Sequence, residues 1–209
     1  MKLTRDTIDR LASRERAALV NSLSGFKSAN LVGTADEAGQ ANLAIMSSCV
    51  HLGSHPPLLG LVIRPGGEER HTLGNILATG VYTLNHVNSD MIPAAHQTAA
   101  RYPRAVSEFD AVGLDVYREP GFHAPFVAQA SLRMGMQLRE HQLLSINRTH
   151  LLIGEVVSLE LPDDALRDDY SVDLAAAGTM ALAGLDSYGR VETLKRMAYA
   201  KPDLPPREL

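Results

Sequence analysis

Hydrophobic and polar residues alternate most regularly in the second half of the chain, in residues 129–142. Alternation with a period of two places apolar side chains on one face of a β-strand and polar side chains on the other. A second segment with strand character, residues 149–161, follows a turn at Asn147 and Arg148. We therefore predict a long β-hairpin. Its apolar face comprises Ala130, Leu132, Met134, Met136 and Leu138, and its polar face comprises Ser131, Arg133, Gln137 and Arg139.

Shorter segments earlier in the chain also have the character of strands. Residues 29–34 and 41–50 flank turn-forming residues at 36–39, which predicts a hairpin. The continuous apolar run 58–63 follows two prolines and is typical of a buried strand. Further strands are predicted at 81–85, 114–117 and 126–128.

Helical periodicity is confined to short segments. Residues 4–23 carry apolar side chains at near-helical spacing, with Thr4 as a plausible N-cap, Gly25 as a stop and Ser13 as a point of division into two helices. Other short helices are predicted at 73–80, 89–103 and 191–199. Because strands follow one another through hairpins, the predicted fold is mainly β with peripheral helices, an antiparallel β-barrel (α+β) rather than a doubly wound sheet.

Composition is that of a globular protein, with 45% hydrophobic and 21% charged residues. The net charge of −4 does not favour nucleic acid or an anionic membrane as a partner. Cys49 is the single cysteine, so an intrachain disulfide is excluded, in keeping with a reducing compartment. No apolar run approaches the roughly 20 residues that span a bilayer. We expect a cytoplasmic protein.

Several common site motifs are missing from the sequence. There is no Gly-x-Gly-x-x-Gly after a strand, no Gly-rich loop ending in Gly-Lys-Ser/Thr and no Gly-x-Ser-x-Gly elbow. Eight histidines invite a metal interpretation, but Gly53 and Pro56 disfavour a shared helical face for His51 and His55. We expect no metal site.

The stretch 64–76 combines the end of a strand, a loop with two arginines and the first turn of a helix. Arg64, Arg70 and the Thr72 hydroxyl, with the unpaired N–H groups of a helix start, are suited to bind a phosphate. The alternative is a solvated loop before an ordinary helix.

The predicted strand 41–50 is rich in small and hydroxyl residues. A flat ring lying against a strand needs small side chains, such as Ala44, so that backbone groups reach its polar edge. Ser47, Ser48 and Cys49 supply more small side chains and hydroxyl donors for a phosphate. The alternative is a buried strand whose hydroxyls bond to neighbouring backbone.

These motifs, taken in order, resemble those of flavin reductase-like, FMN-binding split-barrel proteins over roughly residues 26–200. The resemblance implies one such domain at 26–200, a helical extension at 1–25 and an extended tail at 201–209. The matching motifs are Asn42-Leu43-Ala44, Pro56-Pro57, His71-Thr72, Asn75-Ile76, Tyr82-Thr83-Leu84-Asn85, Ser107-Glu108-Phe109, Gly113-Leu114, Ile153-Gly154-Glu155-Val156 and Gly184-Leu185-Asp186-Ser187-Tyr188.

The resemblance implies particular flavin contacts. Those to the ring are expected from Asn42, Leu43 and Ala44, with Cys49 also counted in the cofactor site. Those to the phosphate are expected among Ser47, Ser48, Arg64, Arg70, His71 and Thr72. The chain departs from many relatives at Ile45, where they have Pro, at His71, where they have Asp or Ser, and near Cys49, where they have an aromatic residue.

The family resemblance implies an FMN-binding oxidoreductase, in particular a homodimeric flavin reductase that passes a hydride from NADH or NADPH to FMN. Since the cofactor carries this chemistry, no catalytic triad is required. We assign His150 and Tyr188 to the nicotinamide or acceptor side, against the alternative that both only pack. The same residues also fit a non-catalytic FMN carrier or sensor, or a dimeric split-barrel protein without efficient reductase activity.

Overall fold

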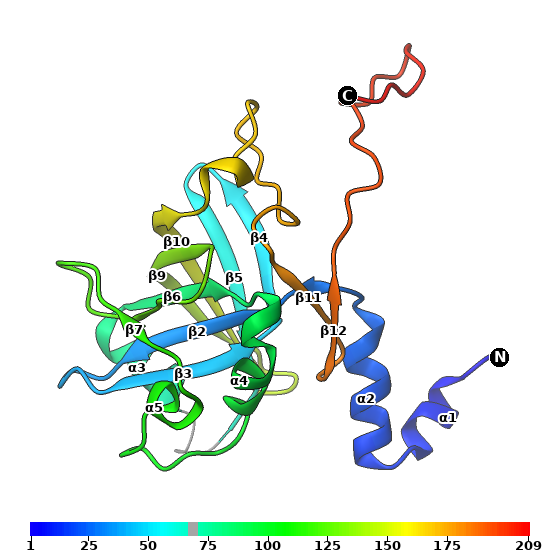
Figure 1. The fold of residues 1–209 in the computed structure, drawn as a ribbon. Helices are drawn as coiled ribbons and strands as arrows, with labels where there is room; N and C mark the ends of the chain where they lie inside the picture. The colour runs from blue at the N-terminus through cyan, green and yellow to red at the C-terminus, as the bar shows by residue number, and fades with distance from the viewer. Residues whose placement is uncertain (67–70) are drawn as a thin grey trace.

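An antiparallel sheet of seven strands forms the body of the molecule (Figure 1). The structure is a computed structural model and describes residues 1–66 and 71–209. Among these residues the strand order in the sheet is β3-β2-β6-β9-β10-β5-β4. The strands are β2 (Asn30–Ala35), β3 (Ala41–Met46), β4 (Cys49–Ser54), β5 (Pro57–Ile63), β6 (Val81–His86), β9 (Arg133–Leu143) and β10 (His150–Glu160).

The long hairpin predicted in the second half of the chain is confirmed. β9 and β10 pair antiparallel from Arg133 opposite Glu160 to Leu143 opposite His150. The register shifts twice, once after Ile153 and once after Val156. Irregularities of this kind bend a strand and increase its twist, which helps this hairpin to curve.

The curvature of the sheet is evident from the side chains that meet inside it. Residues of five strands form one buried cluster, so the sheet folds around its own apolar face as an open barrel. Ser47 and Ser48 join the two edge strands β3 and β4. Ser48 is also bonded to Val62 of β5, with Val62 N–H donating to its carbonyl at 3.1 Å. The strand members of the cluster are Val32, Leu61, Ile63, Tyr82, Leu84, Met136 and Leu152.

The predicted single strand 41–50 is wrong in one respect, because it is two strands. β3 ends at Met46 and β4 begins at Cys49. The break is required because the chain crosses here from one edge of the sheet to the other. The pattern of side chains alone carries no information about this crossing.

Two small sheets accompany the seven-stranded sheet among the described residues. β11 (Met180–Ala183) pairs with both β1 (Lys27–Ser28) and β12 (Ser187–Arg190). β7 (Val116–Tyr117) pairs with β8 (Phe126–Val127). Their apolar residues join a second buried cluster with Leu31 and Leu43 of the main sheet.

Short helices surround the sheet, in agreement with the prediction. The chain between the first two helices breaks at Leu11 and Ala12, next to the predicted division at Ser13. The helix predicted at 89–103 is shorter than expected, and α5 was not predicted. The helices are α1 (Arg5–Arg10), α2 (Ser13–Leu23), α3 (His71–Thr79), η1 (Ser89–Met91), α4 (Ile92–Gln97), α5 (Glu108–Val112) and η2 (Asp163–Ala165).

The helix predicted at 191–199 is wrong, since this segment has no helical residues. Leu194 is 83% exposed and Tyr199 is 92% exposed, so none of the described residues covers an apolar helix face here. A short helix without such packing is marginal in water. Instead, Ala198 N–H donates to the Arg207 carbonyl at 2.8 Å, which folds the tail back on itself.

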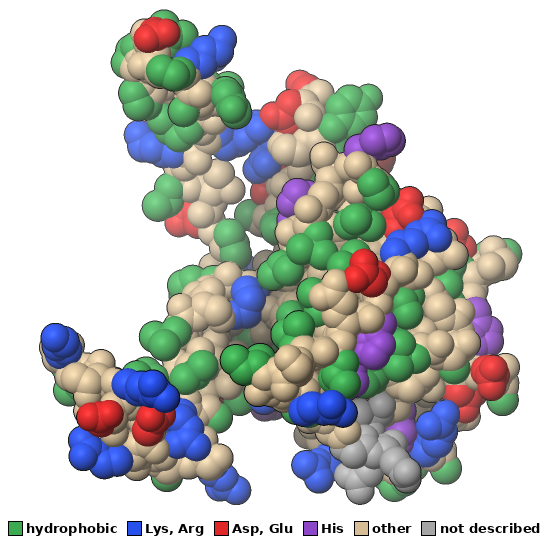
Figure 2. Space-filling model, turned by 180° about the vertical axis from the view of Figure 1, so that it is seen from behind, with side chains coloured by type: hydrophobic (Ala, Val, Ile, Leu, Met, Phe, Trp, Pro, Cys, Tyr) green, Lys and Arg blue, Asp and Glu red, His purple; other side chains and the backbone are tan. Residues whose placement is uncertain are grey.

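The outer parts of the two chain ends extend away from the barrel. Figure 1 shows this for α1 and for the C-terminal arm after β12, whereas α2 lies nearer the body and its Asn21 lines a cavity along β3. Figure 2 shows hydrophobic side chains exposed on the molecular surface. Within the described ranges, none of the helices has the length and apolar character required to cross a membrane.

Candidate functional site

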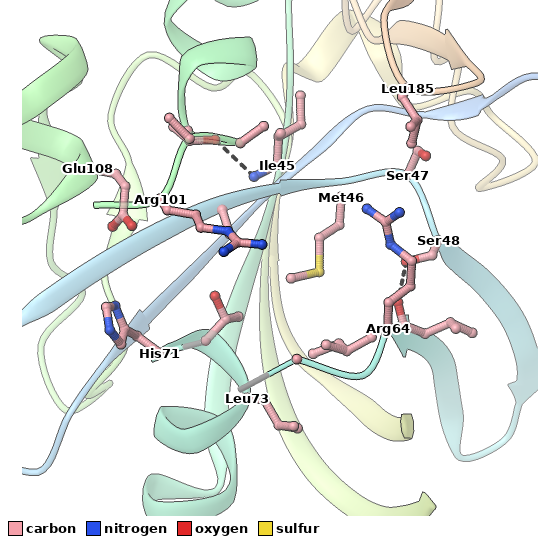
Figure 3. A pocket seen from close by; sticks show the side chains of 18 of the residues that line it. Ile45, Met46, Ser47, Ser48, Arg64, His71, Leu73, Arg101, Glu108 and Leu185 are labelled. Carbon is pink, nitrogen blue, oxygen red and sulfur yellow. Dashed lines mark hydrogen bonds between the residues drawn. The ribbon is translucent and has the colours of Figure 1, made fainter. Parts of the chain in front are cut away.

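A cavity of about 500 Å³ runs along β3 and the turn that follows it. The opposite walls come from residues 64–66 after β5, the first turn of α3 and residues 98–102 after α4. The turn between β11 and β12 closes one end with Leu185. Figure 3 shows these side chains converging on one space from elements that are far apart in the sequence.

Among the described residues, β3 pairs with β2 on one side only. The backbone N–H groups of its other edge are bonded to side chains. Leu43 N–H donates to Glu108 Oε2 at 2.9 Å, and Ile45 N–H donates to Thr98 Oγ1 at 2.9 Å. These bonds occupy donors that an edge strand would otherwise leave open.

A buried polar cluster attaches α3 to the sheet below the cavity. Asn42 Nδ2 donates to Thr72 Oγ1 at 3.0 Å and to Thr34 Oγ1 at 3.2 Å. Asn75 Nδ2 donates to the same Thr34 oxygen at 3.1 Å. Each such bond contributes about 1 kcal/mol, and an orphaned buried partner costs about 1–3 kcal/mol. The cluster therefore holds His71 and Thr72 in place at the cavity wall.

Charged and hydroxyl groups are divided between two sides of the cavity. Figure 3 shows Arg64 beside Ser47 and Ser48 on one side of Met46. On the other side are His71, Arg101 and Glu108. The Ser48 hydroxyl already donates to the Val62 carbonyl at 2.5 Å, so it is available to a ligand as an acceptor.

Most of the predicted cofactor residues are brought together at this cavity. Its lining includes Asn42, Ala44, Ser47, Ser48, Arg64, His71 and Thr72. Leu43 and Cys49 are not part of that lining: Leu43 is buried in the second cluster, and Cys49 packs against the cluster inside the barrel. Burial raises the pKa of the Cys49 thiol to about 11. Arg70 lies outside the described residues.

The two residues assigned to the nicotinamide or acceptor side lie apart from the described cavity lining. His150 stacks on His141, with 2.8 Å between its Nδ1 and His141 Nε2, and its pKa is lowered by desolvation and by the neighbouring His141 and Arg148. Tyr188 Oη lies 3.2 Å from His96 Nδ1, and burial raises the pKa of this phenol. Their assigned roles stay predictions.

Several residues of the cavity were not predicted from the sequence. Thr98, Arg101, Glu108 and Leu185 are among them, and all four line it. Glu108 and Leu185 belong to motifs that carry the family resemblance, but nothing in those motifs indicates that either residue lines the cavity. Thr98 and Arg101 reach the cavity through the segment after α4, whose path has no periodic pattern.

An open antiparallel barrel with a cavity of this size is typical of proteins that bind small molecules. Residues 23–178 match the flavin reductase like domain, so the chain belongs to the flavin reductase-like family. This confirms the predicted family and places the chain among flavin-binding proteins of the oxidoreductase kind.

Similar proteins agree with this assignment. A candidate flavin reductase with a split barrel domain from Shewanella frigidimarina is 48% identical, with a TM-score of 0.92 over 96% of this chain and 100% of that one. An uncharacterized protein of Deinococcus radiodurans is 31% identical over 168 residues, 77% of this chain and 73% of that protein. The 2-nitrobenzoate 2-nitroreductase of Pseudomonas fluorescens is 19% identical and shares the fold, with a TM-score of 0.81 over 98% of each chain. The predicted split-barrel fold is confirmed.

Proposed function

We propose that this protein binds FMN in the cavity along β3 and is an NAD(P)H-dependent flavin reductase, which passes a hydride from the nicotinamide to FMN. One observation carries the proposal: a single cavity is lined by small residues of an edge strand together with hydroxyl and cationic groups. A flat ring needs small side chains beside it, and a phosphate needs hydroxyl and cationic groups.

The residues present fit FMN. A volume of about 500 Å³ lies within the range of roughly 300–1,000 Å³ typical of cofactor pockets. Ala44 leaves space beside the backbone for a ring. Arg64 with Ser47, and His71 with Thr72, offer donors for phosphate oxygens on the two sides of the cavity, while Ser48 lies beside Arg64 with its hydroxyl proton bonded to the Val62 carbonyl. We propose the phosphate contacts from this set, with Arg70 as a further predicted member.

When bound, FMN supplies the chemistry of accepting a hydride. The protein's own residues have the tasks of binding and positioning. Arg64 neutralises phosphate charge, while Asn42 keeps Thr72 and the start of α3 against the sheet. His150 and Tyr188 are retained as proposed residues of the donor or acceptor side.

We also propose a homodimer, supported by uncovered apolar surface on β4 and β10. Val50 and Leu52 are exposed and lie over Gly60, where a Cβ would be 3.3 Å from Val50 Cγ2 and 3.1 Å from Leu52 Cδ1. Val157 and Leu159 are exposed on β10. Exposed apolar residues on a sheet are typical of association surfaces when they are contiguous, which is the arrangement that we propose here. Light scattering after size exclusion should give twice the chain mass, and a stable monomer that keeps its flavin would contradict the dimer.

The absorption spectrum of the purified protein, before and after anaerobic NADH or NADPH, tests the function. We expect a flavin band near ~450 nm that bleaches with one of the donors, as the reducible cofactor dictates. A yellow protein that neither donor reduces, and that has no turnover with added FMN, would identify an FMN carrier or sensor instead. A protein that binds no flavin would refute the proposal as a whole.

The phosphate assignment is tested by Arg64→Ala, with Arg118→Ala as the matched control. Arg118 donates to the Gly39 carbonyl and does not line the cavity. A charge-assisted bond contributes about 1.5–3 kcal/mol, so Arg64→Ala should weaken FMN binding about tenfold to a hundredfold. Riboflavin has no phosphate, so its affinity should change little. Equal losses for the two flavins would place Arg64 away from the phosphate.

A further inference from the structure

We propose that Glu108 is a positioning residue that holds the cavity edge of β3 in place and that its charge weakens the binding of anionic FMN relative to uncharged riboflavin. This inference rests on the proposed function. Glu108 is 6% exposed, accepts the Leu43 N–H at 2.9 Å through Oε2, and lines the cavity.

The first part of the inference follows from the position of β3 at the sheet edge. Its outward N–H groups at Leu43 and Ile45 have no neighbouring strand among the described residues. Glu108 of α5 and Thr98 after α4 supply the acceptors that such a strand would provide. Since Asn42 and Ala44 belong to the same strand, these two bonds also determine where the cavity wall lies.

The second part follows from the difference between the two acceptors. Thr98 accepts the Ile45 N–H with a neutral hydroxyl, which also donates to the Ala95 carbonyl at 2.7 Å. Glu108 brings a carboxylate to a cavity proposed to hold a phosphate. A carboxylate and a phosphate in one cavity of about 500 Å³ repel each other, and the repulsion is stronger where water is partly excluded. A neutral acceptor such as Thr98 can also hold the strand, through a weaker bond, so the charge of Glu108 adds an effect on an anionic ligand to its positioning role.

Glu108→Gln separates the two effects, because glutamine keeps a carbonyl oxygen for the Leu43 N–H but carries no charge. We expect FMN to bind about threefold to tenfold more tightly, with riboflavin affinity unchanged. The advantage of the variant for FMN should shrink as salt is raised from low to high concentration, since screening removes a through-space repulsion. Titration of protein with each flavin, followed by flavin fluorescence, measures these affinities.

Thr98→Val is the matched control, since it removes the bond to Ile45 N–H without changing any charge. We expect it to weaken FMN and riboflavin by a similar factor of about fivefold, with no dependence on salt. This result would show that holding the edge matters for both ligands.

The outcomes distinguish this inference from the proposed function. If the unmodified protein binds neither flavin, the proposed function fails. If it binds FMN and Glu108→Gln leaves the FMN-to-riboflavin affinity ratio unchanged at low salt, the charge effect is refuted. If Glu108→Gln weakens both flavins as much as Thr98→Val does, glutamine does not replace the carboxylate as the acceptor for Leu43 N–H, and the claim that the charge acts only on the anionic ligand is refuted.

Discussion

The close approach of Gly154 to Tyr82 inside the barrel gives a sharp test of the packing. Tyr82 is fully buried, and its hydroxyl has no hydrogen-bond partner among the described residues. A Cβ added at Gly154 would lie 2.1 Å from Tyr82 Oη, 2.9 Å from Tyr82 Cζ and 3.2 Å from Met136 Cε. Because all three atoms belong to the central cluster, none can move away freely.

The magnitudes follow from these distances. Gly154→Ala should destabilise the protein by about 3 kcal/mol, the upper part of the range for an overfilled core. Tyr82→Phe should be neutral or stabilising by up to about 1 kcal/mol, because it removes a buried hydroxyl without a partner. In the double variant the 2.1 Å contact disappears and the two longer contacts remain. The double variant should therefore be destabilised by only about 1 kcal/mol relative to the unmodified protein.

Urea unfolding of the four proteins, followed by circular dichroism, gives the coupling between the two sites. We expect Tyr82→Phe to rescue Gly154→Ala by about 2 kcal/mol. Strict additivity would mean that the hydroxyl does not occupy the space beside Gly154. A loss above roughly 1 kcal/mol in Tyr82→Phe alone would show that the hydroxyl has a partner after all.

Two further predictions concern buried titratable groups. Burial lowers the pKa of His86 to about 4, so between about pH 6.5 and pH 4 the unfolded chain binds a proton that the folded chain excludes. The free energy of unfolding should therefore fall by up to roughly 3 kcal/mol as pH decreases through this range. Urea midpoints across this range should slope downward, and His86→Gln should flatten the slope; an equal slope in both proteins would contradict the assignment. Burial raises the pKa of Cys49 to about 11, so its thiol should react slowly with an aromatic disulfide reagent at pH 8 and rapidly in urea. A native reaction rate equal to that in urea would show that Cys49 is accessible.

Much of the fold was predictable from local patterns. The β9–β10 hairpin follows from alternation, and strand β5 follows from an uninterrupted apolar run, although only Gly60, Leu61 and Ile63 of β5 are buried. These patterns predict structure because each element must bury its apolar face. The helix predicted at 191–199 failed for the same reason, since periodicity cannot say whether a covering surface exists, and Leu194 and Tyr199 have none.

The sequence by itself determined the chemistry available to the site. Arg64, Thr72 and the serine pair at 47–48 occur in stretches whose residue types already favour an anion and a flat ring, and all of them line the cavity. Local sequence was sufficient here because these residues flank strand ends and a helix start, which the apolar pattern locates.

Only the tertiary structure decided which side chains complete the wall of the cavity, and that the carboxylate of Glu108 lines the same cavity as Arg64. Glu108 reaches Leu43 across 65 positions of the chain, and Thr98 reaches Ile45 across 53. Such contacts arise because the unpaired edge of β3 must find acceptors wherever the folded chain provides them. That requirement belongs to the assembled sheet and leaves no periodic trace in the sequence.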